Sequence, residues 1–428
     1  MHTIQEPARE IPVVRQADVL VVGGGPAGFV AATAAARLGA DVVLVERYGC
    51  LGGLATGGLV LYMDAIFDKQ GHQWIGGLPW ETLDRLRAIG GLAEDGPTRP
   101  HADSELLQVV ANELCTEAGV TLRLHSWATS AIVADGRLQG VIVESKSGRQ
   151  AILAPVCIDA TGDGDLAALA GAGYEMGYMR IGLNLKVGGV DRDRFRAFQR
   201  EQPERMRQLD GELRDLGGCP LHPNTTPHSD IGVFWINVLG LSGRDASARP
   251  GASLHESFEG QLSTIDVEDL TYAEVELRRR LVRSLDLYRH NVPGFENVRL
   301  LAFAPQLGVR DSRHIIGQHT LTKTEVVADT AFADTVGMAG VSFADVGHYR
   351  IPYGCLVPRD VRGLLVAGRC ISVDHWIIQS VRLIPPAMMT GQAAGTAAAL
   401  AARDGVSPAE VDIATLQRQL AQDGVILQ

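Results

Sequence analysis

Residues 18–46 of the chain read DVLVVGGGPAGFVAATAAARLGADVVLVE, and this stretch predicts the fold. Asp18–Val22 is a short apolar run rich in β-branched residues. A helical pattern begins directly after the glycines and ends at Gly39, and Val42–Val45 is a second apolar run. The order strand, glycine turn, helix, strand predicts a βαβ unit with parallel strands.

Three glycines in the turn and one acid at its far end predict the ligand of this unit. Gly23 permits a tight turn, Gly25 lets the backbone approach a pyrophosphate, and Gly28 lets the helix pack closely on the sheet. The helix N-terminus favours anions. Glu46 follows about 20 residues later, where a carboxylate accepts hydrogen bonds from the ribose hydroxyls of an adenosine. We expect a dinucleotide site; the alternative is a plain βαβ unit with an ordinary glutamate.

Composition favours a large enzyme that acts on small molecules. The 428 residues suffice for roughly two or three domains. The net charge of −11 disfavours a nucleic acid or an anionic membrane as partner. The polar N-terminus predicts no signal peptide, and no apolar run reaches the roughly 18 residues of a membrane span, so we expect a cytoplasmic protein. Six cysteines without a C-x-x-C pair argue against zinc, iron–sulfur and dithiol centres, so we expect no metal.

Further motifs follow along the chain. Tyr48–Gly58 reads YGCLGGLATGG, and so many glycines predict a backbone pressed against a ligand. Asp135-Gly136 predicts a hairpin turn between two strands. Val156–Ala160 reads as a strand that leads into a second glycine turn at Thr161–Asp165. This turn lacks the full G-x-G-x-x-G pattern, so it predicts closure of the first ligand site rather than a second nucleotide fold.

The C-terminal third carries the densest polar groups. Arg310–His314 reads RDSRH between apolar residues, and His375 and Arg382 come later. Pro385-Pro386 then opens a predicted helix, since proline suits the first helical turn. A row of small residues in this helix suggests close packing under a flat ligand: Gly391, Ala394, Gly395 and Ala398.

These motifs resemble those of FAD-dependent oxidoreductases related to the fumarate reductase flavoprotein and to the wider glutathione-reductase-like superfamily. The resemblance covers nearly the whole chain and is carried by GGGPAG at 23–28, VERYGCLGGLATGG at 45–58, DATGDGDLAALAG at 159–171, GVRDSRHIIG at 308–317, LLVAGRCIS at 364–372 and SVRLIPPAMMTGQAAGTAAALA at 380–401. It implies an α/β fold, with a Rossmann-like FAD-binding domain formed by residues 1–175 and 355–428. An α+β substrate domain, residues 176–354, is inserted in it.

The resemblance also implies FAD as the cofactor. Glu46 is expected on the adenosine ribose, and the helix after Pro385 is expected to point its N-terminus at the flavin pyrimidine edge. The covalent FAD-linking histidine of fumarate reductase has no counterpart in the glycine loop, so we expect non-covalent FAD. The expected cofactor residues are Gly23, Gly25, Pro26, Ala27, Gly28, Glu46, Arg47, Gly52, Gly53, Thr56, Ala160, Thr161, Gly162, Gly368, Arg369, Pro386 and Ala387.

Catalytic candidates follow from the chemistry. Taking a hydride from a carbon that bears OH or NH requires a base for the heteroatom proton, and histidine suits this task near neutral pH. His314 and His375 are the candidates, each preceded by an aspartate within three residues, with His375 slightly favoured and His348 and Tyr349 next in line. Relatives often carry Arg-Glu-Ser-Arg-Arg where this chain ends in His314, which weakens the inference of a substrate-carboxylate clamp. Positive charge for substrate anions or reduced flavin is expected from Arg310, Arg313 and Arg382.

We therefore expect an FAD-dependent oxidoreductase of dehydrogenase or oxidase type that takes a hydride from a small alcohol or amine onto flavin N5. The alternatives are a flavin-dependent monooxygenase, an NAD(P)H-fed reductase, a non-catalytic FAD-binding subunit of a complex, or an RNA-modifying flavoprotein, which the acidic balance disfavours. The substrate, the electron acceptor, the redox direction and the oligomeric state, with a homodimer as one option, stay open. Pocket residues from the middle block are expected among His222, Asn224, His228, Trp235 and Asn237.

Overall fold

A fully parallel sheet forms the centre of the protein. The structure, a computed structural model, describes residues 2–94, 99–215, 218–245, 247, 258–341 and 346–428. The strand order is β19-β10-β2-β3-β6. The strands are β19 (Leu364–Val366), β10 (Val156–Asp159), β2 (Val19–Val22), β3 (Val42–Val45) and β6 (Thr121–Arg123). The first four strands are buried throughout, as expected for a parallel sheet covered on both faces. The predicted α/β fold is confirmed.

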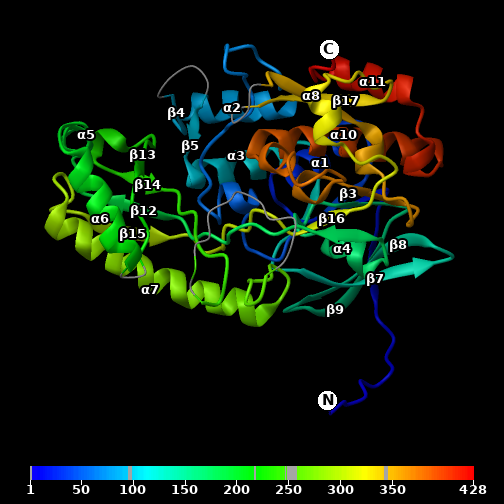
Figure 1. The fold of residues 1–428 in the computed structure, drawn as a ribbon. Coiled ribbons are helices and arrows are strands. Elements are labelled where there is room, and N and C mark those ends of the chain that lie inside the picture. The colour runs from blue at the N-terminus through cyan, green and yellow to red at the C-terminus, as the bar shows by residue number, and fades with distance from the viewer. Residues whose placement is uncertain (1, 95–98, 216–217, 246, 248–257, 342–345) are drawn as a thin grey trace.

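Helices α1 (Pro26–Arg37) and α10 (Ile384–Asp404) lie against one another beside this sheet (Figure 1). A Cβ added at Gly391 would lie 2.2 Å from the carbonyl oxygen of Ala27, and one added at Gly395 would lie 2.1 Å from that of Ala31. The two backbones therefore meet only because α10 carries glycine at both positions. These two members of the small-residue row pack against α1 and not under a flat ligand, which corrects that interpretation.

Further helices and a small antiparallel meander complete this part. The helices are α2 (Leu78–Ala88), α3 (Ser104–Glu117), α4 (Asp165–Leu169), α9 (Ile378–Val381) and α11 (Ile413–Gln422). The meander has the order β1-β9-β8-β7. Its strands are β1 (Val13–Gln16), β9 (Gly148–Leu153), β8 (Arg137–Ser145) and β7 (Trp127–Ala134). Asp135 and Gly136 have φ of 50° and 69°, the left-handed pair that a type I′ hairpin turn requires, so the predicted hairpin is confirmed.

A second, smaller sheet lies at the far end of the molecule, in green and yellow in Figure 1. Its order is β13-β14-β12-β15, and all its pairs are antiparallel. The strands are β13 (Pro223–Asn224), β14 (Phe234–Ile236), β12 (Leu185–Gly188) and β15 (Arg299–Phe303). The helices of this part are α5 (Arg192–Glu201), α6 (Pro203–Asp215) and α7 (Val267–Asn291), and the last of these runs along its edge (Figure 1).

Buried side chains form two cores that correspond to these two parts. The smaller core takes its residues from 181–309, together with Leu59. Residues 315–353, which the sequence prediction placed in the inserted domain, contribute to the larger core instead. They carry β16 (Arg313–Ile315), α8 (Lys323–Val327), β17 (Thr335–Gly340) and β18 (His348–Pro352), and β16 pairs with β11 (Tyr174–Met176). A further short pair is β4 (Leu92–Ala93) with β5 (His101–Ala102). The domain limits stay a prediction.

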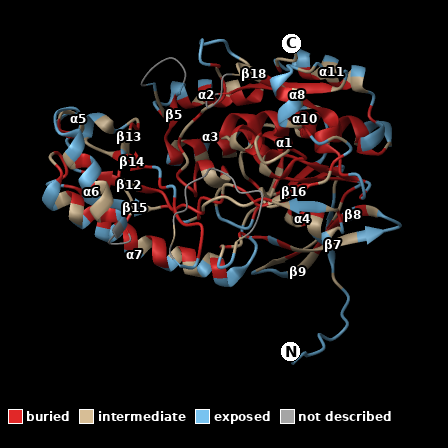
Figure 2. Ribbon diagram, viewed as in Figure 1, coloured by how far each residue is buried: buried red, intermediate tan, exposed pale blue. Residues whose placement is uncertain are grey.

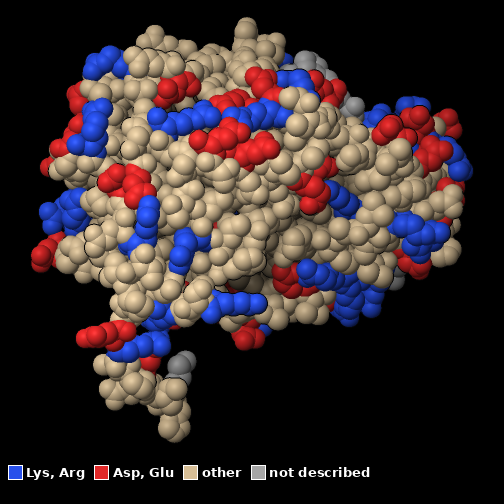
Figure 3. Space-filling view, turned by 180° about the vertical axis from the view of Figure 1, so that it is seen from behind, with Lys and Arg blue, Asp and Glu red and all other residues tan. Residues whose placement is uncertain are grey.

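Burial and charge follow the pattern of a globular protein. Buried residues, red in Figure 2, fill the sheet and the α1–α10 layer, and exposed residues lie on the outer helix faces. On the face seen in Figure 3, basic and acidic side chains are intermixed. None of the described helices combines the length and apolar character needed to cross a bilayer.

Candidate cofactor and substrate site

A cavity of about 720 Å³ is lined by residues of both cores. Its volume falls within the roughly 300–1,000 Å³ typical of small-molecule and cofactor sites. Most of the expected cofactor residues line it: Gly23, Gly25, Pro26, Ala27, Glu46, Arg47, Gly53, Ala160, Thr161, Gly162, Gly368, Arg369 and Ala387. Gly28, Gly52, Thr56 and Pro386 lie outside the lining. Of these, Gly52 and Thr56 shape the glycine loop, because Gly52 donates to the carbonyl of Gly24 and the Thr56 hydroxyl to that of Leu51.

The turn between β2 and α1 forms a cradle that fits a pyrophosphate. Gly23 has φ of 100°, and a Cβ added at Gly28 would lie 1.7 Å from the carbonyl oxygen of Gly23. At Gly25, in contrast, an added Cβ would meet nothing closer than 3.9 Å. Gly25 is the N-cap residue of α1, and it has no side chain that could accept hydrogen bonds from the first N–H groups of the helix. The first N–H groups of the helix are therefore open to an anionic ligand.

Glu46 is fixed at the carboxyl end of β3. The side chain is 7% exposed, and its oxygens accept hydrogen bonds from the backbone N–H of Gly24 at 2.6 Å and of Tyr48 at 2.8 Å. A carboxylate offers about four acceptor positions, so two backbone donors leave room for two hydroxyl groups. This arrangement is consistent with recognition of a ribose.

We expect Glu46→Ala to weaken FAD binding by roughly 10- to 150-fold, because charge-assisted hydrogen bonds contribute about 1.5–3 kcal/mol each. The FAD dissociation constant of reconstituted apoprotein measures this change. Glu113→Ala is the matched control, since Glu113 is exposed on α3 away from the cavity lining. An unchanged dissociation constant in Glu46→Ala would show that Glu46 is only a strand-end residue.

The second glycine turn is tied to the segment after β19. Nε of Arg369 donates to the carbonyl of Gly162 at 2.9 Å, and its Nη2 donates to Asp163 at 2.6 Å. Asp159, buried at the end of β10, accepts hydrogen bonds from the backbone and side chain of Thr161. The second glycine turn and Arg369 thus line one side of the cavity together.

Ser126 and the first two residues of β7 line the cavity, although no sequence motif marks them. Ser126, Trp127 and Ala128 belong to the lining, and the backbone N–H of Ser126 donates to the carbonyl of Glu46 at 2.9 Å. They lie beside Glu46, in the part of the cavity where the adenosine of the cofactor is expected. Their only sequence signal is their place at the start of a strand that follows β6.

Five arginines line the cavity. Arg47 lies next to Glu46 in the chain, and the other four differ in how their charge is balanced. Arg369 pairs with Asp163 at 2.6 Å, and Arg313 pairs with Asp165 at 2.8 Å. The other two, Arg310 and Arg382, have no carboxylate within salt-bridge distance among the described residues. Of these four guanidinium groups, two are therefore paired with a carboxylate and two are not.

Arg310 donates to the carbonyl oxygens of Val238 at 2.9 Å and Leu239 at 2.7 Å. Burial lowers the pKa of Arg310 to about 9, and Arg382 and Arg180 add to the effect. Burial likewise lowers the pKa of Arg382 to about 10, with Arg369 adding to it, and Nε of Arg382 has no hydrogen-bond partner among the described residues. This part of the wall carries positive charge that an anionic ligand group would stabilise.

The two candidate histidines are brought together, although neither lines the cavity. His314 and His375 have ring centroids 5.3 Å apart, and Asp311 lies between them. Asp374, the aspartate next to His375 in sequence, does not serve it as expected: its carboxylate accepts hydrogen bonds from the backbone N–H of Trp376, Ile377 and Lys323. The carboxylate that faces both histidines is that of Asp311.

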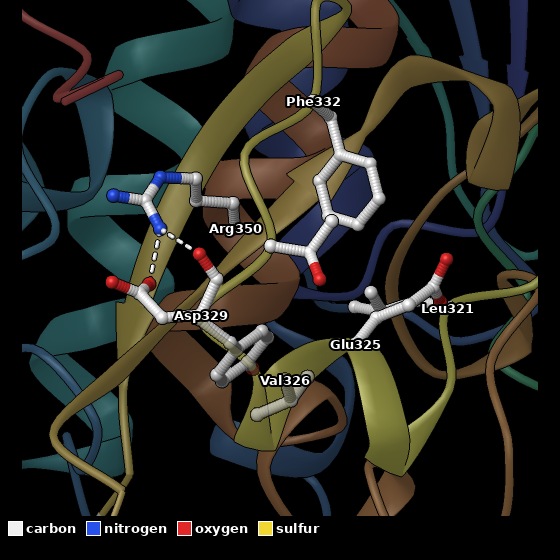
Figure 4. Close-up of a pocket in the computed structure, with 8 residues that line it drawn as sticks. Leu321, Glu325, Val326, Asp329, Phe332 and Arg350 are labelled. Atoms are coloured by element: carbon white, nitrogen blue, oxygen red, sulfur yellow. Dashed lines mark hydrogen bonds and ion pairs between the residues drawn. The ribbon is translucent and has the colours of Figure 1, made fainter.

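His348 and Tyr349 lie elsewhere, near a second recess that encloses no measurable volume. In Figure 4, Arg350 of β18 pairs with Asp329 beside Phe332. His348 stacks on Trp74 with ring centroids 4.0 Å apart. These contacts give His348 a packing role.

Polar side chains from three segments also line the cavity. Tyr62, Asn237 and Gln306 line it, whereas Trp235 is fully buried behind Tyr62 in an edge-to-face contact. The hydroxyl of Tyr62 donates to Asn224 at 2.5 Å. Of the five middle-block residues expected in a pocket, only Asn237 is part of the lining.

The sequence profile of a family described as FAD dependent oxidoreductase matches residues 18–420. The chain belongs to the FAD dependent oxidoreductase family. The predicted family, enzyme class and cofactor FAD are confirmed. In this family member, the α1 turn would hold the pyrophosphate, Glu46 the ribose, and the N-terminus of α10 with Ala387 the flavin ring.

Individual relatives share only part of the chain. The tRNA uridine 5-carboxymethylaminomethyl modification enzyme MnmG of Wolinella succinogenes is 34% identical over 139 residues, which are 30% of this chain and 22% of that protein. Digeranylgeranylglycerophospholipid reductase 1 of Methanopyrus kandleri is 31% identical over 153 residues, 34% of this chain and 39% of that protein. The match thus spans less than half the length of these curated relatives.

The crystal structure of p-nitrophenol 4-monooxygenase PnpA from Pseudomonas putida DLL-E4 is similar in fold to this FAD dependent oxidoreductase. The TM-score is 0.50 at 11% identity, and the match covers 96% of this chain and 89% of that chain. At this identity the likeness shows the fold alone.

Proposed function

We propose that this FAD dependent oxidoreductase oxidises a small polar substrate, an alcohol or an amine. FAD supplies the hydride-accepting chemistry when it is bound. The protein binds and orients the substrate, excludes water and accepts the heteroatom proton.

The observation that carries this proposal is the arrangement at the arginine wall. Arg310 and Arg382 place uncompensated positive charge on the cavity, and the buried cluster of Asp311, His314 and His375 joins the segments that bear them. The cavity also extends from the α1 turn to polar groups of the smaller core. It therefore offers space and charge to a small molecule next to the flavin, and we propose His375 of the adjoining cluster as the proton acceptor.

The alternatives lack a comparable observation. A flavin-dependent monooxygenase or a reductase fed by NAD(P)H binds a nicotinamide. With one full dinucleotide fingerprint, at Gly23–Gly28, the sequence predicts no separate nicotinamide domain and leaves a transient nicotinamide site as the alternative. A non-catalytic FAD-binding subunit has no need of buried charge at the cavity wall.

Anaerobic mixing of the purified holoprotein with a panel of alcohols, amines, NADH and NADPH tests the proposal. We expect loss of flavin absorbance with a subset of the alcohols or amines. Reduction by NADH or NADPH alone would support the reductase or monooxygenase instead. No reduction by any compound of the panel would favour the non-catalytic subunit.

A further inference from the structure

We infer that Asp311 is a positioning residue that orients His375 for proton transfer, and that His314 anchors the same carboxylate from its other side. The inference rests on the proposed function and assigns different roles to the two histidines. Asp311 itself touches neither the cavity nor, on this account, the substrate; it acts through His375.

The geometry shows one carboxylate shared by two imidazoles. Asp311 is fully buried. Its Oδ1 lies 2.6 Å from Nε2 of His314, and its Oδ2 lies 3.7 Å from Nδ1 of His375. Gly177 makes room for this carboxylate, because a Cβ there would lie 2.2 Å from Oδ1. The carboxylate thus has a defined position between β11, β16 and the segment that carries His375.

The exposure of the two rings separates their roles. The His314 side chain is 5% exposed and uses Nε2 for the short contact with Asp311, so this ring is enclosed and serves as an anchor. The His375 side chain is 16% exposed and turns Nδ1 toward Asp311. A carboxylate at Nδ1 fixes the tautomer and orientation of an imidazole and leaves Nε2 as the atom that exchanges a proton.

The cluster lies in the segment that forms the cavity wall. Arg310 and Arg313, which flank Asp311 in the chain, line the cavity, and so does Arg382, on which the charge of Asp311 acts. Two histidines and one carboxylate also make up a known type of metal site, and their ligand atoms lie within 4.8 Å of one another. The positive charge of Arg382 beside the carboxylate and the short contact with His314 favour a hydrogen-bonded cluster over a divalent cation.

The electrostatics agree with this geometry. Burial raises the pKa of Asp311, but contacts with His314 and His375 outweigh burial and bring it down to about 2. The nearby carboxylate of Asp311 raises the pKa of His375, partly opposed by burial, and the charges of Glu175 and Asp374 add to the rise. Asp311 therefore stays ionised across the range in which His375 titrates.

The test is Asp311→Asn in the holoenzyme, read out by NMR titration of the His375 ring in the oxidised, substrate-free state. The His375 signal is assigned by its absence in His375→Gln. In the wild type we expect a midpoint above the ordinary histidine value of about 6.5. In Asp311→Asn we expect it to fall by about one pH unit or more, the scale on which a close opposite charge acts.

The same variant shifts catalysis in a predictable direction. A base must be neutral to accept a proton, so the rate of flavin reduction rises with pH through the pKa of His375. Because Asp311→Asn lowers this pKa, its rate profile is expected to shift to lower pH, with a smaller plateau as orientation is lost. Asp374→Asn is the matched control: its carboxylate binds backbone N–H groups, and we expect a much smaller shift.

Two results would overturn the inference. One is a His375 midpoint at or below about 6.5 in the wild type, a measurement that does not depend on the folding of Asp311→Asn. The other is a stoichiometric divalent metal in the purified holoenzyme that Asp311→Asn loses, since the ring nitrogens would then be metal ligands. If no alcohol or amine reduces the flavin, the proposed function fails, while the NMR titration still decides the role of Asp311.

Discussion

Replacing His375 with glutamine is expected to slow flavin reduction by substrate by about 10²- to 10⁴-fold, the usual contribution of a general base. Glutamine fills a similar volume and keeps a hydrogen-bond donor for Asp311, but it cannot accept a proton near neutral pH. FAD should remain bound, since His375 does not line the cavity. Single-turnover anaerobic reduction, followed by flavin absorbance over a pH series, measures the effect.

The comparison with His314→Gln makes this prediction specific. His314 is enclosed and anchors Asp311, so its loss is expected to change the midpoint of the pH profile while the dependence on pH persists. His375→Gln is expected to abolish that dependence. If both variants keep the wild-type rate and profile, the proton acceptor is another group.

Gly28→Ala, which adds a methyl group, is expected to lower both the thermal stability and the FAD affinity of the protein. The added Cβ would lie 1.7 Å from the carbonyl oxygen of Gly23, and that turn forms the pyrophosphate cradle. Gly28→Ala must therefore displace the turn or the helix. Overpacking costs about 1–3 kcal/mol, and the upper end corresponds to roughly 100-fold in FAD affinity. Thermal unfolding and the FAD dissociation constant measure the two consequences.

Gly211→Ala is the matched control for this steric argument. Gly211 is also a helical glycine, in α6, but a Cβ there would meet nothing within 4 Å. Alanine is the better helix former by about 1 kcal/mol, so the control is expected to unfold at an equal or higher temperature. If Gly28→Ala unfolds at the same temperature and binds FAD with the same dissociation constant as Gly211→Ala, the close approach of α1 to the turn does not matter for stability or binding.

The fold and the cofactor end of the cavity could be predicted because their signals are local. Gly23, Gly28 and Glu46 lie within one βαβ unit, where spacing along the chain fixes their relation in space. The same holds for the hairpin at Asp135-Gly136, where both residues must adopt positive φ.

Relations between distant segments could not be predicted in this way. The small residues of α10 indicate that something approaches closely, but not that it is α1 rather than a ligand. Sequence proximity suggested Asp374 as the partner of His375, whereas the fold brings Asp311 to it from 64 positions away along the chain. Ser126–Ala128 carry no motif, because they contribute to the cavity through their place at the start of β7 and just before it.

The most direct test of this account is the flavin content of the purified protein. The account predicts a yellow protein with one FAD per chain, released intact into the supernatant when the protein is denatured and precipitated. This follows from the pyrophosphate cradle at α1, the fixed Glu46 and the absence of any predicted covalent link. A colourless protein that fails to take up added FAD would contradict the account, and flavin that stays with the precipitate would contradict non-covalent binding.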